Sequence, residues 1–317
     1  MRLITAEVPD SPARVHQPDR ERLVVGLVQT RWHADPEEHR HVLAEGIHTA
    51  AEAGAQVVCL PELTLSRYPA DTRPEGDAAA TAEDLETGPT YTFAAKAAAD
   101  AGAAVHASLF ERADGPDGPD GRGYNTAILV APDGTLLGRT RKLHIPISAG
   151  YYEDHYFRGG PAEPEPYPVV ELPGTGREPA ARFGLPTCWD QWFPEVARAY
   201  SLRGAEVLVY PTAIGSEPDH PEFDTQPLWR QVIVGNGIAN GTFMVVPNRW
   251  GDEGMLTFYG SSFISDPYGR VLVSAPRDAD AVLVAPLELD QRRDWLDLFP
   301  FLATRRPDTY GVLTGRR

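Results

Sequence analysis

The chain has 317 residues, of which 42% are hydrophobic and 23% are charged, an average globular composition that excludes wholesale disorder. Asp and Glu number 45 and Lys and Arg 29, and the formal net charge of −16 disfavours nucleic-acid binding because such a surface repels phosphates. Two cysteines exclude a disulfide framework and a cysteine-based zinc site. With no membrane-length apolar run and no secretory signal, we expect a protein of the cytoplasm that binds no membrane.

The first residues differ in character from the rest. Residues 1–20 are polar and contain prolines, so we expect a flexible N-terminal extension followed by a single domain over residues 21–317. Residues 22–29 form an apolar, valine-rich run that is typical of a buried strand. Asp35 and the proline after it predict the start of a helix, which Gly54 ends.

Strands and helices then alternate along the chain. A helix is expected over residues 91–100 and another from residue 193. Further strands are expected over residues 55–60, 104–110, 124–130, 135–139, 169–172, 181–185, 206–210, 243–247, 258–264, 271–274 and 281–286. Because these strands are too many for one ordinary sheet, the pattern predicts a layered α/β domain with two packed mixed sheets and helices outside.

Cys188 lies where a strand passes into a predicted helix. A thiol at such a corner is held rigidly, and nearby backbone N–H groups can stabilise a thiolate and then an oxyanion. The alternative is a buried, inert cysteine, and the local pattern leaves the two interpretations level. Cys59 lies inside an apolar strand, where the inert interpretation prevails.

Two further residues follow predicted strand ends. Glu62 comes just after the strand at 55–60, at the edge where α/β folds gather their site residues. Lys142 follows the strand at 135–139. Alone, each is readily explained as a surface charge. Together with Cys188 they suit one task, in which the thiol attacks a carbonyl or nitrile carbon, Glu62 accepts its proton and Lys142 stabilises the developing charge.

Several longer segments of the sequence resemble those of a known family. The chain resembles the carbon–nitrogen hydrolase (nitrilase) superfamily, whose members use a Glu–Lys–Cys triad, and the likeness extends from about residue 22 to 313. The segment after Cys188 and the Gly-Ser-Glu-Pro loop are most similar to the N-carbamoylputrescine amidase branch. The matching segments are residues 61–63, 141–146, 188–195, 204–218, 248–249, 258–264 and 306–308.

The resemblance implies a four-layer α-β-β-α sandwich that pairs through its helices into homodimers or larger assemblies. It implies no cofactor and no metal, and a small molecule as the substrate. It assigns a second carboxylate to Glu153, which would support Lys142 and the hydrolytic water, and an oxyanion donor to the backbone N–H of Trp189. The substrate contacts expected beside them are Tyr68, Asp190 and Glu217.

Three stretches depart from that branch. Leu185, Pro186 and Thr187 precede the cysteine where small apolar residues are usual, and Pro186 removes a backbone donor there. Asn236 stands where a histidine is expected, and residues 293–304 also differ. These departures bear on the substrate and leave the triad intact.

The charges near the triad predict the kind of substrate. A carboxylate-ended substrate calls for Arg or His near the nucleophile, yet the residues after Cys188 carry no cation, and Glu217 adds a carboxylate. We therefore expect a cationic or neutral tail, with N-carbamoylputrescine first. For Glu217, pairing with an arginine such as Arg249 is an equally weighted hypothesis. The sequence is also compatible with a β-ureidopropionase, with another small amide or nitrile hydrolase, and with a catalytically silent assembly scaffold.

Overall fold

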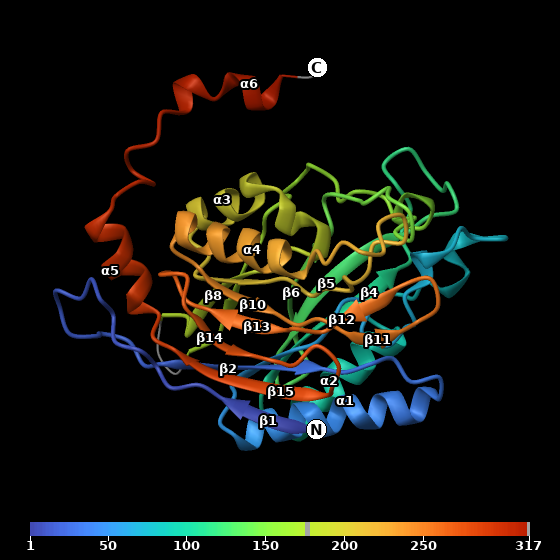
Figure 1. Ribbon diagram of the computed structural model, residues 1–317, viewed down its shortest axis with the longest axis horizontal. Coiled ribbons are helices and arrows are strands. Elements are labelled where there is room, and N and C mark those ends of the chain that lie inside the picture. Colours follow the sequence, from blue (N-terminus) through green and yellow to red (C-terminus); the bar gives the residue numbers. More distant parts are fainter. Residues whose placement is uncertain (175–177, 316–317) are drawn as a thin grey trace.

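The computed structural model describes residues 1–174 and 178–315. Within these residues two large mixed sheets pack face to face, and helices cover both outer faces (Figure 1). This arrangement confirms the predicted α-β-β-α sandwich. No helix of the described ranges is long and apolar enough to cross a membrane.

The larger sheet contains the N-terminal half of the chain together with one late strand. Its seven strands, as far as the chain is described, follow the order β1-β15-β2-β3-β4-β5-β6. Their bounds are Arg2–Thr5 (β1), Leu23–Gln29 (β2), Val57–Cys59 (β3), Ala104–Glu111 (β4), Tyr124–Val130 (β5), Leu136–Arg141 (β6) and Ala281–Leu287 (β15). Strands β2, β3 and β4 run parallel, so the residues after β3 leave the sheet at its carboxyl edge.

The smaller sheet is built from the second half. Its six described strands follow the order β14-β13-β10-β9-β8-β7, and β8, β9 and β10 run parallel. A separate hairpin, β11-β12, stands beside it. The bounds are Val169–Leu172 (β7), Ala181–Gly184 (β8), Val207–Val209 (β9), Phe243–Val246 (β10), Trp250–Asp252 (β11), Thr257–Tyr259 (β12), Phe263–Ser265 (β13) and Val271–Ser274 (β14).

Helices close the two outer faces. The larger sheet is covered by α1 (Pro36–Glu52) and α2 (Pro89–Ala101), and the smaller sheet by α3 (Pro194–Leu202) and α4 (Gln226–Asn240). Asp35 caps α1 as predicted, because its side chain accepts from the backbone N–H groups of Glu37 and Glu38. Helix α5 (Asp290–Leu298) packs against the end of α4, where Trp295 Nε1 donates to the carbonyl of Ile238 at 2.9 Å. Helix α6 (Gly311–Thr314) lies on the C-terminal arm that follows α5 and leaves the body in Figure 1.

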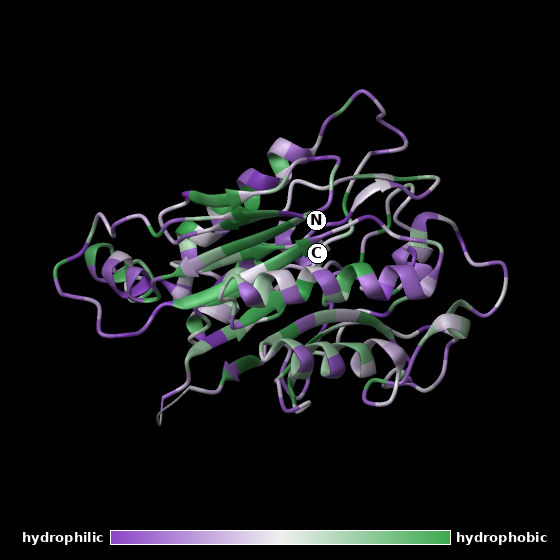
Figure 2. Cartoon of the chain, turned by 90° about the horizontal axis from the view of Figure 1, so that it is seen from below, coloured by the Kyte–Doolittle hydropathy of each residue, from purple (hydrophilic) through white to green (hydrophobic). Residues whose placement is uncertain are grey.

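The main hydrophobic core lies between the sheets. It combines Leu27 and Val57 of the larger sheet with Phe183 and Val245 of the smaller one, all of them fully buried. One further apolar cluster lies between the larger sheet and its helices, and another lies between the smaller sheet and its helices. Figure 2 shows the same division, with hydrophobic strands in the middle and mixed helices outside. The packed sheets thus hold the segments after β3, β6 and β8 on one frame.

Two sequence expectations need correction. The first residues are not a loose extension throughout, because Arg2–Thr5 pairs in parallel with β15 and Ser11 donates to the buried Asp294. The strand predicted over residues 258–264 is two strands. Gly260 and Ser261 have φ of 52° and 59°, a left-handed conformation that ends β12 and redirects the chain into β13.

We expect Phe183→Ala to destabilise the fold by about 3–5 kcal/mol, because it removes a buried aromatic ring and leaves a cavity between the sheets. Urea unfolding followed by circular dichroism measures this loss. Phe223→Ala is the matched control, since Phe223 is 55% exposed, and should change the free energy of unfolding by less than about 0.5 kcal/mol. Equal effects of the two substitutions would contradict the assigned core.

Candidate active site

The three predicted triad residues follow three strands. Glu62 lies in the turn after β3, and Lys142 directly follows β6. Cys188 opens a short 3₁₀ turn, Cys188–Trp192, that comes after β8. Glu153 lies in a second 3₁₀ turn, Glu153–His155. Packing one sheet on the other brings these four segments, far apart in the sequence, to the same end of the sandwich.

Lys142 occupies the centre of the site. Its Nζ donates to Glu62 Oε1 at 2.9 Å and to both carboxylate oxygens of Glu153, at 2.8 and 2.7 Å. Lys142 and Glu62 are 0% exposed and Glu153 is 1% exposed. One ammonium therefore joins two carboxylates in a fully buried cluster whose formal charge is −1.

The buried charges stabilise one another. Burial alone would lower the pKa of Lys142, but the carboxylates of Glu153 and Glu62 outweigh it and raise this pKa above its ordinary value. Burial raises the pKa of Glu153, although the ammonium of Lys142 opposes the shift. Lys142 therefore stays protonated and can act as a fixed positive charge.

The carboxylate of Glu62 is fixed by three donors. Besides Lys142, it accepts from Asn125 Nδ2 at 2.7 Å and from the backbone N–H of Ala213 at 2.9 Å. Asn125 lies on β5, and Ala213 lies in the segment after β9. Both sheets therefore contribute to the position of this one side chain.

Cys188 is held in an uncommon backbone conformation. Its φ is 33°, and its N–H donates to the carbonyl of Pro211 at 3.0 Å. Burial, followed by the negative charge of Glu62, raises the pKa of the thiol well above its ordinary value, while Lys142 lowers it. Burial alone raises the pKa of Cys59. Of the two cysteines, Cys188 is the one whose thiol responds to the charged cluster.

Asp190 has a different place from the predicted substrate contact. Its carboxylate is 0% exposed and accepts from the backbone N–H groups of Thr187 at 3.1 Å and His144 at 2.9 Å. His144 Nδ1 also lies 2.7 Å from an oxygen of this carboxylate. Because its oxygens are committed to the protein, Asp190 is unavailable to a substrate. It instead ties the turn of Cys188 to the segment after Lys142.

Tyr68 and Glu217 were also predicted to contact the substrate. Tyr68 is fully buried and donates its hydroxyl to Glu153 Oε1 at 2.8 Å, so it supports the charged cluster. Glu217 is half-buried and accepts from Thr225 Oγ1 at 3.2 Å. Its expected partner under the pairing hypothesis, Arg249, binds Glu253 at 2.8 Å, so that hypothesis is wrong. Direct substrate contacts by Tyr68, Trp189 and Glu217 stay predictions.

An open hollow is bounded by residues 215–225, by the hairpin β11–β12 and by Arg277 and Asp278. Among the described residues that line it, Glu217, Glu222, Asp224 and Asp278 carry carboxylates, and Arg277 carries the one positive charge. Arg277 is engaged by Asp224, with nitrogen–oxygen distances of 2.8 and 2.9 Å. Tyr259 also lines the hollow and packs in the same apolar cluster as Cys188. The hollow is therefore acidic, and Tyr259 connects its lining to the apolar cluster that contains Cys188.

Several supporting residues are not evident from the sequence. Asn125 could have been noticed as a polar residue inside an apolar strand. Tyr151, whose hydroxyl accepts from the N–H of Gly215 at 3.0 Å, gave no such signal. Asn236 stands out in the sequence only as a departure, and it donates to the carbonyl of Gln191 at 2.9 Å, tying α4 to the turn of Cys188. In the described ranges, no group of three or more His, Cys, Asp or Glu side chains could hold a metal ion.

The chain is similar to known proteins over most of its length. The chain is 35% identical to an N-carbamoylputrescine amidase of Arabidopsis thaliana, over 93% of this chain and 96% of the relative. It is 34% identical to a citrullinase of Francisella tularensis subsp. tularensis, over 90% of this chain and 96% of the relative.

Two solved structures share the fold. A carbon–nitrogen hydrolase of Helicobacter pylori G27 superposes with a TM-score of 0.78 at 28% identity, covering 93% of this chain and 99% of that one. A mutant amidase of Nesterenkonia sp. AN1, with acrylamide added at its active-site cysteine, superposes with a TM-score of 0.69 at 25% identity, covering 92% and 99%. The carbon–nitrogen hydrolase family model matches residues 24–297. The chain belongs to the carbon–nitrogen hydrolase family.

Proposed function

We propose that this chain hydrolyses an N-carbamoyl amine, with Cys188 as the nucleophile and Glu62 as the general base. The observation that carries the proposal is the buried Glu62–Lys142–Glu153 cluster next to the thiol. Burying an ammonium and two carboxylates costs several kcal/mol per ion before pairing, and a hydrophobic core has no need of them. A silent scaffold gives no reason to keep such a cluster.

The proposed step begins with a protonated thiol. Because burial and Glu62 raise the pKa of Cys188, little thiolate exists at neutral pH, and proton removal must accompany the attack. Sγ bonds to the ureido carbon while its proton passes to Glu62. The carbonyl oxygen gains negative charge, which the ammonium of Lys142 and the backbone N–H of Trp189 would stabilise.

The intermediate then collapses in two stages. The leaving nitrogen takes the proton from Glu62 as its bond to carbon breaks, and the acyl group remains on sulfur. Glu62 next accepts a proton from water, whose oxygen attacks the same carbon, and the thiol is restored by the returned proton. Water releases the acyl group as a carbamic acid, which loses carbon dioxide and thereby frees the second nitrogen. N-carbamoylputrescine hydrolysed by this route yields putrescine, carbon dioxide and ammonia in total. The thiol must stay reduced throughout, which fits the cytoplasm as the proposed compartment.

We expect Cys188→Ala to lose essentially all turnover and Glu62→Gln to lose about 10²–10⁴-fold, because a positioned base contributes that much. Ammonia release from a panel of ureido compounds, amides and nitriles measures the loss. Lys142→Ala should behave like Glu62→Gln, and Glu153→Ala should also lose stability, because it leaves a buried ammonium short of a partner.

Cys59→Ala is the matched control for the nucleophile and should keep its activity. Iodoacetamide should label Cys188 far faster than Cys59, which is 0% exposed inside β3. An active Cys188→Ala variant, or equal labelling of the two thiols, would contradict the assignment. A wild-type protein that releases no ammonia from any of the panel would favour the scaffold.

The acidic hollow supports a substrate that ends in a cation. Its one described arginine is neutralised by Asp224, so Glu217, Glu222 and Asp278 leave the hollow negative. Glu217 also has acceptor capacity beyond its single bond from Thr225. We propose that Glu217 binds the terminal ammonium of N-carbamoylputrescine. The similarity to a citrullinase favours one second candidate, citrulline, which ends in both an ammonium and a carboxylate.

We expect N-carbamoylputrescine to be hydrolysed with a higher kcat/KM than N-carbamoyl-β-alanine or citrulline. Glu217→Gln should raise KM for N-carbamoylputrescine about 10-fold or more with little change in kcat. The reason is that it removes a charged hydrogen bond made equally to the bound substrate and to the transition state. Steady-state assays of ammonia release measure both constants.

Glu222→Gln is the matched control for Glu217, because Glu222 is exposed on the rim of the same hollow. It removes the same charge without the proposed contact, and KM should change little. Preference for N-carbamoyl-β-alanine would indicate a β-ureidopropionase, and preference for citrulline would indicate the second candidate. Either preference would contradict the charge argument.

We also propose that the chain forms a homodimer or a larger homo-oligomer through the α3–α4 face and the C-terminal arm. Support comes from exposed apolar side chains on these elements, namely Leu202 (46%), Leu228 (48%), Val312 (79%) and Leu313 (63%). A groove runs between α3 and the arm, and in Figure 1 the arm reaches beyond the body. A second copy packing into this groove would cover these side chains.

We expect light scattering after size-exclusion chromatography to give at least twice the mass of 34.6 kDa. The double variant Val312→Asp, Leu313→Asp should shift the protein toward the monomer, because two charges would be buried in the interface. Val15→Asp is the control, since Val15 is 81% exposed elsewhere on the surface. A wild-type monomer would contradict the proposal.

A further inference from the structure

A strained turn carries the proposed general base. Leu63, directly after Glu62, has a φ of 49°, a left-handed conformation that costs a non-glycine residue energy. Such a conformation persists only where surrounding contacts enforce it. Two sets of contacts hold it here. Ser108 Oγ of β4 accepts from the N–H of Leu63 at 3.1 Å, and a second set comes from one residue far along the sequence, Arg249.

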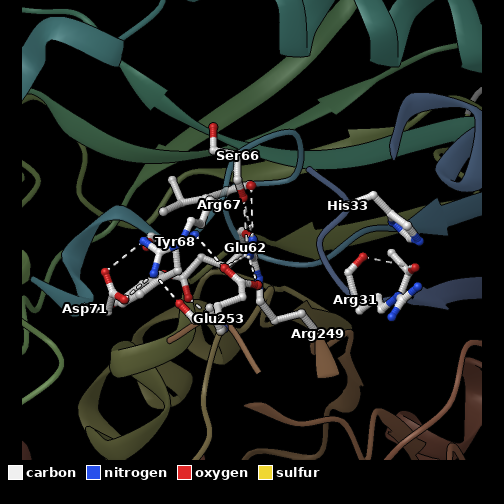
Figure 3. A network of polar contacts seen from close by, with 12 residues as sticks. Arg31, His33, Glu62, Ser66, Arg67, Tyr68, Asp71, Arg249 and Glu253 are labelled. Carbon is white, nitrogen blue, oxygen red and sulfur yellow. Dashed lines mark hydrogen bonds and ion pairs between the residues drawn. The ribbon is translucent and has the colours of Figure 1, made fainter. Parts of the chain in front are cut away.

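Arg249, which lies outside the Glu62–Lys142–Glu153 cluster, donates hydrogen bonds to the backbone of this turn. Its Nη2 donates to the carbonyl oxygens of Glu62 at 2.6 Å and Leu63 at 3.2 Å, and the guanidinium also reaches the carbonyl of Ser66 at 3.2 Å (Figure 3). Arg249 is 3% exposed. A planar guanidinium with five fixed donors suits such a set of carbonyl oxygens, whereas a lysine ammonium would not span them.

Glu253 holds both the arginine and the next part of the chain. Its carboxylate oxygens lie 2.8 and 3.2 Å from Arg249 Nη1, and one of them accepts from the backbone N–H of Tyr68 at 2.9 Å. Tyr68 in turn donates its hydroxyl to Glu153, which binds Lys142. Figure 3 shows the pair lying beside the segment that carries Glu62 and Tyr68.

The two residues flank β11, so they belong to the hairpin β11–β12. This hairpin also lines the acidic hollow, through Trp250, Thr257 and Tyr259. One buried ion pair thus joins the wall of the proposed substrate site to both carboxylates that flank Lys142. It reaches Glu62 through the backbone of the turn and Glu153 through Tyr68.

We propose that Arg249 and Glu253 are positioning residues that set the placement of Glu62 and Tyr68 against Cys188. Neither side chain touches the reacting atoms. The proposal rests on the proposed function of Glu62 as the base that deprotonates the thiol. A misplacement of about 1 Å by a distant substitution can cost about 10²-fold in rate, so the effect is measurable.

The test measures the rate at which iodoacetamide alkylates Cys188, resolved from Cys59 by mass spectrometry, across the neutral and alkaline pH range. This readout does not depend on which C–N substrate is native. Wild-type protein should react faster than Glu62→Gln at neutral pH, because Glu62 takes the thiol proton. Arg249→Met should slow alkylation at neutral pH about 10-fold or more and give the pH profile of Glu62→Gln.

Conservative variants separate positioning from stability. Arg249→Lys keeps the buried cation beside Glu253 but loses the planar set of guanidinium donors. This variant should therefore fold, and its Cys188 should still be alkylated slowly. Glu253→Gln can still accept from the N–H of Tyr68 and should lie between wild type and Arg249→Met. In steady-state assays these variants should lower kcat with little change in KM, since neither Arg249 nor Glu253 lines the hollow.

Arg270→Met is the matched control. Arg270 and Asp266 form another pair at the same sequence spacing, with Nε and Oδ2 2.6 Å apart, in the turn after β13. This control should lower the melting temperature and leave the pH profile unchanged. If Arg249→Lys and Glu253→Gln keep the wild-type profile, the pair is structural only and the inference is wrong. If Glu62→Gln itself matches wild type, the proposed function of Glu62 fails as well.

Discussion

The site depends on one buried ammonium, that of Lys142, which bonds to both Glu62 and Glu153. A lone charge in this place would be lost by deprotonation, and two facing carboxylates without the lysine would repel each other. The two carboxylates therefore keep the ammonium of Lys142 protonated, and the ammonium in turn opposes the rise that burial causes in the pKa of Glu153. Burial and the negative charge of Glu62 raise the pKa of the neighbouring Cys188, so its thiol stays protonated until a base removes the proton.

Hydrogen bonds at the charged cluster join the two sheets, in addition to the apolar core between them. Glu62 accepts from Asn125 of the larger sheet and from Ala213, which follows a strand of the smaller one. Asp190 joins the turn of the cysteine to the segment of the lysine. Sliding one sheet over the other would break these bonds, so the inter-sheet packing and the geometry of the site stabilise each other.

The same constraint separates the chemistry from the choice of substrate. The charged cluster is closed and committed to the protein, whereas the hollow is open and lined by carboxylates that outnumber its described cation. Different loops build the two parts, and the hairpin β11–β12 contacts both of them. Under the proposed function, changes in the hollow would alter affinity while the buried cluster keeps its reaction, as long as Arg249 and Glu253 remain.

Local patterns in the sequence determined most strands, the α1 cap at Asp35 and the position of Glu62, Lys142 and Cys188 after strands, because period, capping and strand ends are properties of neighbouring residues. Other features were decided by the tertiary structure. The polar start of the chain forms β1 because β15 offers it a free edge, and Asp190 turns inward because His144 meets it there. Arg249 pairs with Glu253 and grips the turn of Glu62, a contact across 187 positions. No local pattern encodes such contacts, because they arise only when the sheets pack.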